Sequence, residues 1–263
     1  MIQDFLGAIA SAQAYRRFAA EKTARTLLYL CFISFLFTVG GTIAMRMRVG
    51  PMIDETFQWL ESQVPTLVLS GGKVTSTIAE AKRLSHPSAP EVAVMIDTLR
   101  TAPVLAQDMH DAKVIAYLTN NALYVEERPG EIRPYDLSKA GLDRPVTIDA
   151  KFFHDAGGAL KTVIYPVAVV VVFAFAAAWT AFAALLYAVL GLLFNALAGS
   201  TLTFGTLYRI AIHAQTTALL LRIAMSFMPF VVPMSALLTI MVTSSYLWMG
   251  VRANARLDET TSA

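Results

Sequence analysis

Four apolar runs stand out from an otherwise mixed chain. The first covers residues 26–44, contains no charged side chain, and has Arg25 and Arg46 at its ends. At about 1.5 Å per residue, a helix of this length just crosses a hydrocarbon core of roughly 30 Å. A cleaved signal peptide is the competing interpretation, but the run is long for one and no convincing small-residue cleavage site follows it. We therefore predict a retained transmembrane helix over residues 26–45.

The second apolar run, residues 162–198, holds no charged residue at all. It is much longer than one span, yet it is too short for two spans of roughly 17–25 residues each with a turn between them. We expect a single long helix that is tilted or protrudes from the membrane, ended by Asn195 and the small residues that follow it. Residues 199–206 then form a turn.

The last two runs cover residues 207–228 and 231–251, with Pro229 between them and Pro233 near the start of the last. The earlier of the two carries Arg209 near its start and His213 and Arg222 inside it. The later one ends at basic residues. We expect these runs to be the third and fourth transmembrane helices.

Basic residues gather at both ends of the chain. The N-terminal arm, residues 1–25, looks amphipathic and is basic next to the first span, so it is expected to lie as a helix on the cytoplasmic leaflet or to be a solvated lead-in. The tail, residues 252–263, begins with Arg252 and includes Arg256. The positive-inside rule then places both ends in the cytoplasm and residues 46–161 outside.

A three-span alternative remains, in which the third apolar run re-enters the membrane or lies flat. It would place the C-terminus outside, and the arginines of the tail argue against it. We expect a multi-pass protein of a bacterial inner (plasma) membrane, in contact with the lipid bilayer.

Composition supports this division of the chain. Hydrophobic residues make up 56% and charged residues only 15%, against about 25% charged in soluble domains. Between residues 47 and 160 we count 11 basic and 15 acidic side chains, so this part is net negative although the chain carries a formal +2. An acidic outer domain and a single cysteine, Cys31, argue against nucleic-acid binding and a disulfide-stapled fold.

The outer segment shows mixed helical and strand patterns. Glycines and asparagines, which accept left-handed backbone, stand at the centres of two predicted hairpins. The expected elements are a helix over 53–63, hairpins over 66–76 and 114–128, and strands over 91–99 and 132–137. The fold class predicted is an α-helical integral membrane protein with four transmembrane helices and a small α+β extracytoplasmic domain between the first and second spans.

Short sequence motifs follow this order of elements. They are the FLGAIASAQAYRRF lead, VPTLVLSGGKV at the start of the outer domain, MIDT at 95–98, and TNNALYV in the second hairpin. With four spans around them, they resemble an uncharacterised bacterial membrane family whose best-known members are labelled maltodextrin utilisation proteins. The resemblance covers nearly the whole chain in architecture. It implies a four-span inner-membrane protein, associated in some members with sugar uptake, and it assigns no catalytic residue.

Asp97 and Thr98 form the family-like dipeptide and are candidate functional residues of the outer domain. The alternative is that Asp97 ends a buried strand by accepting a hydrogen bond from its own local backbone, which is common for this residue type.

A few outer residues could bind a divalent cation. Asp108, His110 and Asp111 lie close together in sequence, and His154 with Asp155 recurs before the second span. There is no HExxH motif and no pair of cysteines, so exposed polar positions are the better interpretation. We predict no metal, no cofactor and no catalytic residue.

Ionisable residues in the third span are the stronger signal, because a charge near the bilayer centre costs at least about 2.5–3.5 kcal/mol. His213 and Arg222 are candidate functional residues, on opposite sides of an ideal helix. Arg222 is expected to reach the headgroups or an acidic residue of the outer domain. Polar neighbours could complete a cluster with His213, but the spans hold no carboxylate as a relay partner. These neighbours are Asn195, Gln215, Thr216 and Thr217.

Three functions are compatible with this pattern. The first is a non-enzymatic accessory or sensor-like protein whose outer domain binds an envelope component or partner and supports a larger membrane complex, including one for solute uptake. The second is a small transporter or transport subunit that uses the polar groups of the third span. The third, an envelope enzyme, would need a pocket joining Asp97, Asp108, His110 and His154. We favour the first, with a membrane-protein partner or a second copy of the chain as the binding partner.

Overall fold

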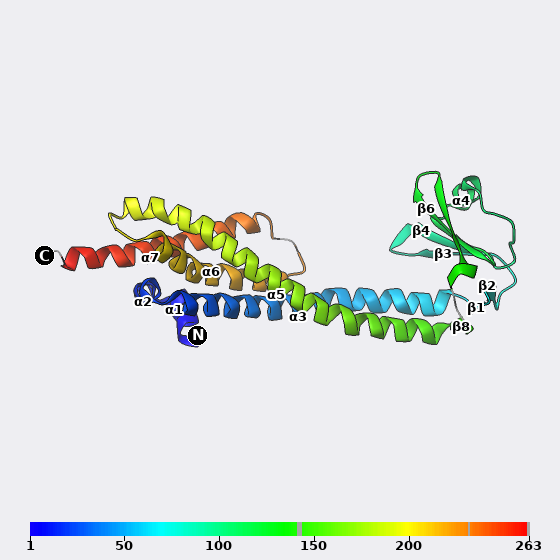
Figure 1. Cartoon of the computed structure of the whole chain (residues 1–263), viewed down its shortest axis with the longest axis horizontal. Helices are drawn as coiled ribbons and strands as arrows, with labels where there is room; N and C mark the ends of the chain where they lie inside the picture. The colour runs from blue at the N-terminus through cyan, green and yellow to red at the C-terminus, as the bar shows by residue number, and fades with distance from the viewer. Residues whose placement is uncertain (141–143, 231, 262–263) are drawn as a thin grey trace. The chain divides into compact units, whose positions relative to one another are not determined.

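The computed structural model describes residues 1–140, 144–230 and 232–261, and the chain divides into two compact units (Figure 1). The helical unit contains residues 1–48 and 164–263, and the α+β unit contains residues 49–163. Two helices contribute residues to both units: α3 (Thr23–Gln63) and α5 (Ala150–Leu197).

Within the described residues, three helices are long and apolar enough to cross a membrane: α3, α5 and the Ser235–Ala255 part of α7 (Ser235–Thr261). The second predicted span is indeed one long helix of 48 residues. The helix predicted over 53–63 as an outward continuation of the first span is the last part of α3, which runs through Pro51 without a break. The third predicted span corresponds to α6 (Phe204–Ser226), which is not among these three helices and which carries Arg209, His213 and Arg222.

Helix α6 contributes more buried residues to the core of the helical unit than any other described helix. Its residues from Ile210 to Thr216 are buried without interruption, so this helix is covered on all sides over about two turns. Ala184 and Ala188 of α5 and Leu247 of α7 belong to the same core. The start of α6 is fixed by Thr203, whose side chain accepts a hydrogen bond from the backbone N–H of Thr206.

The N-terminal arm forms two short helices, α1 (Ile2–Ala10) and α2 (Ala14–Ala20), rather than one. Both contact α6, and α2 also contacts α7. Tyr15 and Phe18 are fully buried in the helical core, and the Tyr15 hydroxyl donates to the carbonyl of Ala8 at 2.9 Å. The arm is therefore more than a solvated lead-in, because Tyr15 and Phe18 are enclosed by protein, while Ile2 and Leu6 of α1 stay exposed.

The α+β unit contains two sheets. The larger has the strand order β3-β4-β5-β6-β7, in which only β4 and β5 are parallel and are connected through α4 (Ala106–Ala112). The smaller has the order β2-β1-β8 and is antiparallel. The strands are β1 (Leu67–Ser70), β2 (Lys73–Ser76), β3 (Lys82–His86), β4 (Ala89–Ile96), β5 (Ala116–Leu118), β6 (Ala122–Arg128), β7 (Glu131–Asp136) and β8 (Val146–Ile148), and Leu137–Ala140 is a 3-10 turn.

Both predicted hairpins are confirmed. Strands β1 and β2 pair around Gly71 and Gly72, which have φ of +56° and +75°, and β5 pairs with β6 on either side of Asn120. A third hairpin joins β3 to β4, in which His86 ends β3 and pairs with Ala89 of β4.

Within the α+β unit, α3 and α5 run side by side in opposite directions. Lys161 Nζ lies 2.5 Å from Asp54 Oδ1, and His154 Nδ1 lies 3.4 Å from Glu61 Oε1. Between these pairs, Gly157 faces Phe57 so closely that an added Cβ would lie 2.9 Å from the ring. The glycine thus permits the two helices to approach.

Candidate functional site

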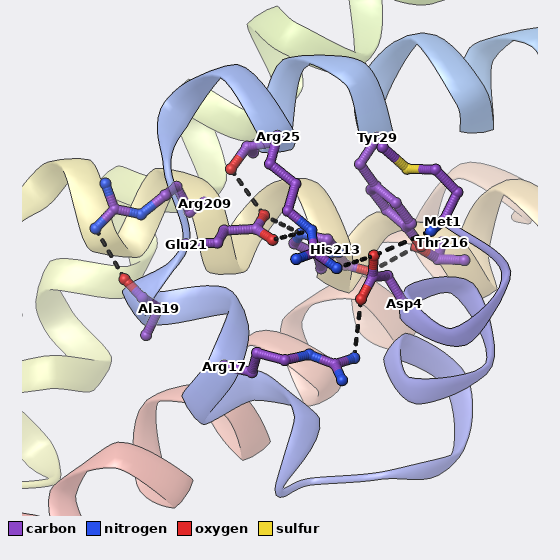
Figure 2. A network of polar contacts seen from close by, with 11 residues as sticks. Met1, Asp4, Arg17, Ala19, Glu21, Arg25, Tyr29, Arg209, His213 and Thr216 are labelled. Carbon is purple, nitrogen blue, oxygen red and sulfur yellow. Dashed lines mark hydrogen bonds and ion pairs between the residues drawn. The ribbon is translucent and has the colours of Figure 1, made fainter.

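A buried pair of a histidine and a glutamate lies at the centre of the helical unit (Figure 2). His213 of α6 is fully buried, and its Nε2 lies 2.7 Å from Oε1 of Glu21, which follows α2. The imidazole lies between two aromatic rings, with centroid distances of 3.8 Å to Phe18 and 4.1 Å to Tyr29. Glu21 also accepts a hydrogen bond from the Thr26 hydroxyl at 2.8 Å. Burial raises the pKa of Glu21, but the hydrogen bonds from His213 and Thr26 outweigh burial and lower it.

A second carboxylate, Asp4 of α1, forms ion pairs with the neighbouring cations (Figure 2). Its oxygens accept hydrogen bonds from Arg17 at 2.9 Å and Arg25 at 2.8 Å, and the amino group of Met1 lies 3.3 Å away. Burial raises the pKa of Asp4, but Arg25 and the amino group of Met1 outweigh burial and hold the pKa below its usual value. Because Arg25 also lies 3.6 Å from Glu21, the two carboxylates belong to one network.

The polar cluster expected around His213 forms only in part. Thr216 is within it, because its hydroxyl lies 2.7 Å from that of Tyr29 and 2.7 Å from the His213 carbonyl. Gln215 donates instead to the Thr180 carbonyl of α5 at 3.2 Å. Asn195 bonds the backbone of Leu202 in the turn between α5 and α6. These two amides therefore fix helix packing and a turn rather than the histidine.

Arg222 lies away from this network and lines a cavity of about 840 Å³ between α5, α6 and α7. Its guanidinium lies over the ring of Phe37, 5.4 Å from the centroid, and it forms no hydrogen bond or ion pair with another described residue of the helical unit. Gln215 and Arg48 line the same cavity. His213 and Arg222 thus lie apart, as expected for two residues on opposite sides of an ideal helix.

In the α+β unit, Asp97 directly follows β4. Its Oδ1 accepts from the Arg100 backbone N–H at 3.2 Å, and its Oδ2 accepts from the Tyr117 hydroxyl at 3.1 Å. Thr98 is buried beside it. Asp97 therefore closes a local turn at the end of a strand, as the alternative interpretation of this dipeptide expects.

The other candidate residues of the α+β unit are engaged separately. Asp108 accepts from the Leu105 backbone N–H and from Arg100, and these contacts hold the pKa of its carboxyl below its usual range. Asp111 accepts from Gln107 in the same helix, and Asp155 pairs with Lys151 in α5. Over the described residues, no three His, Cys, Asp or Glu side chains are placed to hold a metal ion together.

Sequence reasoning did not single out Glu21, Phe18 or Tyr29. Glu21 precedes the first predicted span, so a search for carboxylates inside the spans passes over it. Its one sequence signal is that it is a lone acidic residue in a stretch that is otherwise basic. At this site the imidazole and the carboxylate form a hydrogen bond that is almost out of contact with water.

Apolar helices of membrane-spanning length, joined to an α+β unit, indicate a membrane protein. Residues 2–251 match the model of a protein family described as a protein of unknown function, DUF1189, and the chain belongs to this family. No curated protein and no solved structure matches the chain.

Proposed function

We propose that this protein is a non-enzymatic accessory or sensor-like component of a bacterial inner membrane. In this proposal α3, α5, α6 and α7 are the four spans, both termini are cytoplasmic, and the α+β unit is extracytoplasmic. That unit binds an envelope component or a membrane-protein partner, and a second copy of the chain is the other candidate. The resemblance to proteins labelled for maltodextrin utilisation makes a solute-uptake complex the first place to look.

The observation that carries the proposal is an apolar pair on a braced loop of the α+β unit. Leu99 and Leu105 are 68% and 65% exposed. The loop between them is held by Arg100, which donates to the Pro103 carbonyl and to Asp108 at 2.6 Å. Two large apolar side chains presented on a fixed loop are typical anchors for a protein partner.

Site-specific photo-crosslinking from the full-length protein at native level tests this surface. A crosslinker at Leu99 should capture a partner, and a matched crosslinker at exposed Val92 should capture much less. Leu99→Lys should abolish capture from position 105 while the protein stays at normal abundance. If crosslinkers at Leu99 and Leu105 yield only the uncrosslinked monomer, and purification in mild detergent recovers only the protein itself, the proposal fails.

A small transporter or transport subunit is the second candidate, and the cavity beside Arg222 and Gln215 supports it. In that case Arg222→Ala and His213→Ala should lower uptake of the solute. Unchanged growth and uptake in both variants would exclude this candidate while leaving the accessory role intact.

A further inference from the structure

We propose that the cavity between α5, α6 and α7 is a binding site for an anionic phospholipid, with its phosphate on Arg222 and Arg48 and an acyl chain between the helices. The site is independent of the partner surface on the α+β unit. It follows from the shape of the cavity, its charge, and the free donors of Arg222.

The cavity is elongated and mainly apolar. Its lining on α5 extends from Phe175 to Leu190, which is about 22 Å along a helix. Trp179 and Leu186 on α5 and Ile240 on α7 are among the wall residues. A slot of this length with apolar walls fits a hydrocarbon chain better than a small hydrophilic solute.

The charge in the cavity is entirely positive over its described lining. Arg222 and Arg48 are present, whereas no lining residue is an aspartate or glutamate. Arg48 already donates to the Met228 carbonyl. Arg222 lies over the face of Phe37 and has no hydrogen bond or ion pair within the described part of the chain, so its five N–H donors are available to an anion. A guanidinium binds phosphate oxygens in a fork geometry.

The position of Arg222 also suits a headgroup. It lies four residues before Ser226, the last residue of α6, so it is about 6 Å from the helix end. If α6 is a span, this depth is close to the headgroup region. The chain of a lipid bound there would point toward Gln215 and Thr180, deeper along the same helices.

Quenching of Trp179 by brominated lipids tests the site in the full-length protein. Trp59→Phe and Trp248→Phe isolate the fluorescence of Trp179, which lines the cavity. In vesicles of phosphatidylcholine, brominated phosphatidylglycerol should quench this residue more strongly than brominated phosphatidylcholine at the same mole fraction. Arg222→Gln should weaken the apparent affinity about tenfold, the size expected for one lost charge-assisted hydrogen bond.

Controls separate the site from general surface charge and from misfolding. Arg252→Gln removes an exposed arginine that does not line the cavity, and it should leave quenching unchanged. Ala183→Phe fills the cavity while keeping both arginines and should also lower quenching by phosphatidylglycerol. Equal quenching by the two lipids would overturn the proposal. Competition by inorganic phosphate would also overturn it, because the bound anion would then be free phosphate. Stronger quenching by a brominated fatty acid would do the same, because the bound anion would then be a carboxylate.

Discussion

His213 shows how a polar residue is accommodated in the middle of an apolar helix. Its partner Glu21 comes from outside the spanning segments, 192 positions earlier in the chain, and two aromatic rings cover the imidazole. Buried ionisable groups are costly unless each has a partner. The N-terminal arm therefore supplies the carboxylate partner that α6 lacks for His213. The Glu21–His213 pair in turn fixes the arm to the helical unit.

Replacing Glu21 by Gln should destabilise the protein by about 2 kcal/mol, because a hydrogen bond to a charged group is lost. Thermal unfolding in detergent measures the effect. In a His213→Gln background the same replacement should cost much less, since the partner is already absent. Fully additive effects of the two replacements would show that the two side chains are not coupled.

The contacts of Asp4 should make the stability of the N-terminal arm depend on pH. Its pKa in the folded protein lies below the ordinary value of 3.8, so its contribution to stability is present above that value. The contribution is lost as the pH falls through 3.8 and on through the lower pKa of the folded state. Hydrogen exchange of residues 2–20 should therefore speed up in acid relative to α6.

Asp4→Asn is the matched control for this acid effect. The amide cannot titrate, so the arm of this variant should exchange faster at neutral pH and show little further change in acid. If acid speeds up hydrogen exchange of the arm equally in the unmodified protein and in Asp4→Asn, another group is responsible for the acid effect.

At the scale of elements, regular patterns were predictable and long-range contacts were not. The hairpins around Gly71 and Asn120 have strong turn residues between alternating strands, and both are present. Strand β3, with the sequence KRLSH, has little apolar alternation, so only its pairing with β4 makes it a strand. The Glu21–His213 pair joins distant segments, and no local pattern reports such a contact.

Gly72 should be the most sensitive position of the first hairpin. Its φ is +75°, and an added Cβ would lie 2.5 Å from the Cα of Ser138, which is backbone and cannot easily move. Gly72→Ala should cost roughly 1–3 kcal/mol from strain and overlap together. Gly71 has φ of +56° but open space around it, so Gly71→Ala should cost less. Equal unfolding temperatures for the two variants would contradict this difference.

At the scale of the whole molecule, the topology depends on α6. Three of the described helices qualify as spans by length and apolarity, and α6 is the fourth only if its buried polar residues are sheltered by its neighbours, as His213 is. The number of spans decides on which side the C-terminus lies.

Labelling of single cysteines in cells tests the four-span topology. In a Cys31→Ser background, a membrane-impermeant maleimide should react from outside with Glu91→Cys of the α+β unit. Gln3→Cys and Arg252→Cys, both at exposed positions, should react only after the membrane is permeabilised. Reaction of Arg252→Cys from outside would establish three spans instead.

The separation of Glu21 from His213 along the chain has a consequence for biogenesis. A ribosome that adds about 5–20 residues per second finishes α1 and α2 roughly 10 to 40 s before it reaches His213, given a spacing of 192 residues. During that interval Phe18 and Glu21 lack their partner His213, although both side chains are buried in the folded protein. Nascent chains stalled before α6 should therefore be preferred substrates of membrane-protein insertion factors and quality-control proteases.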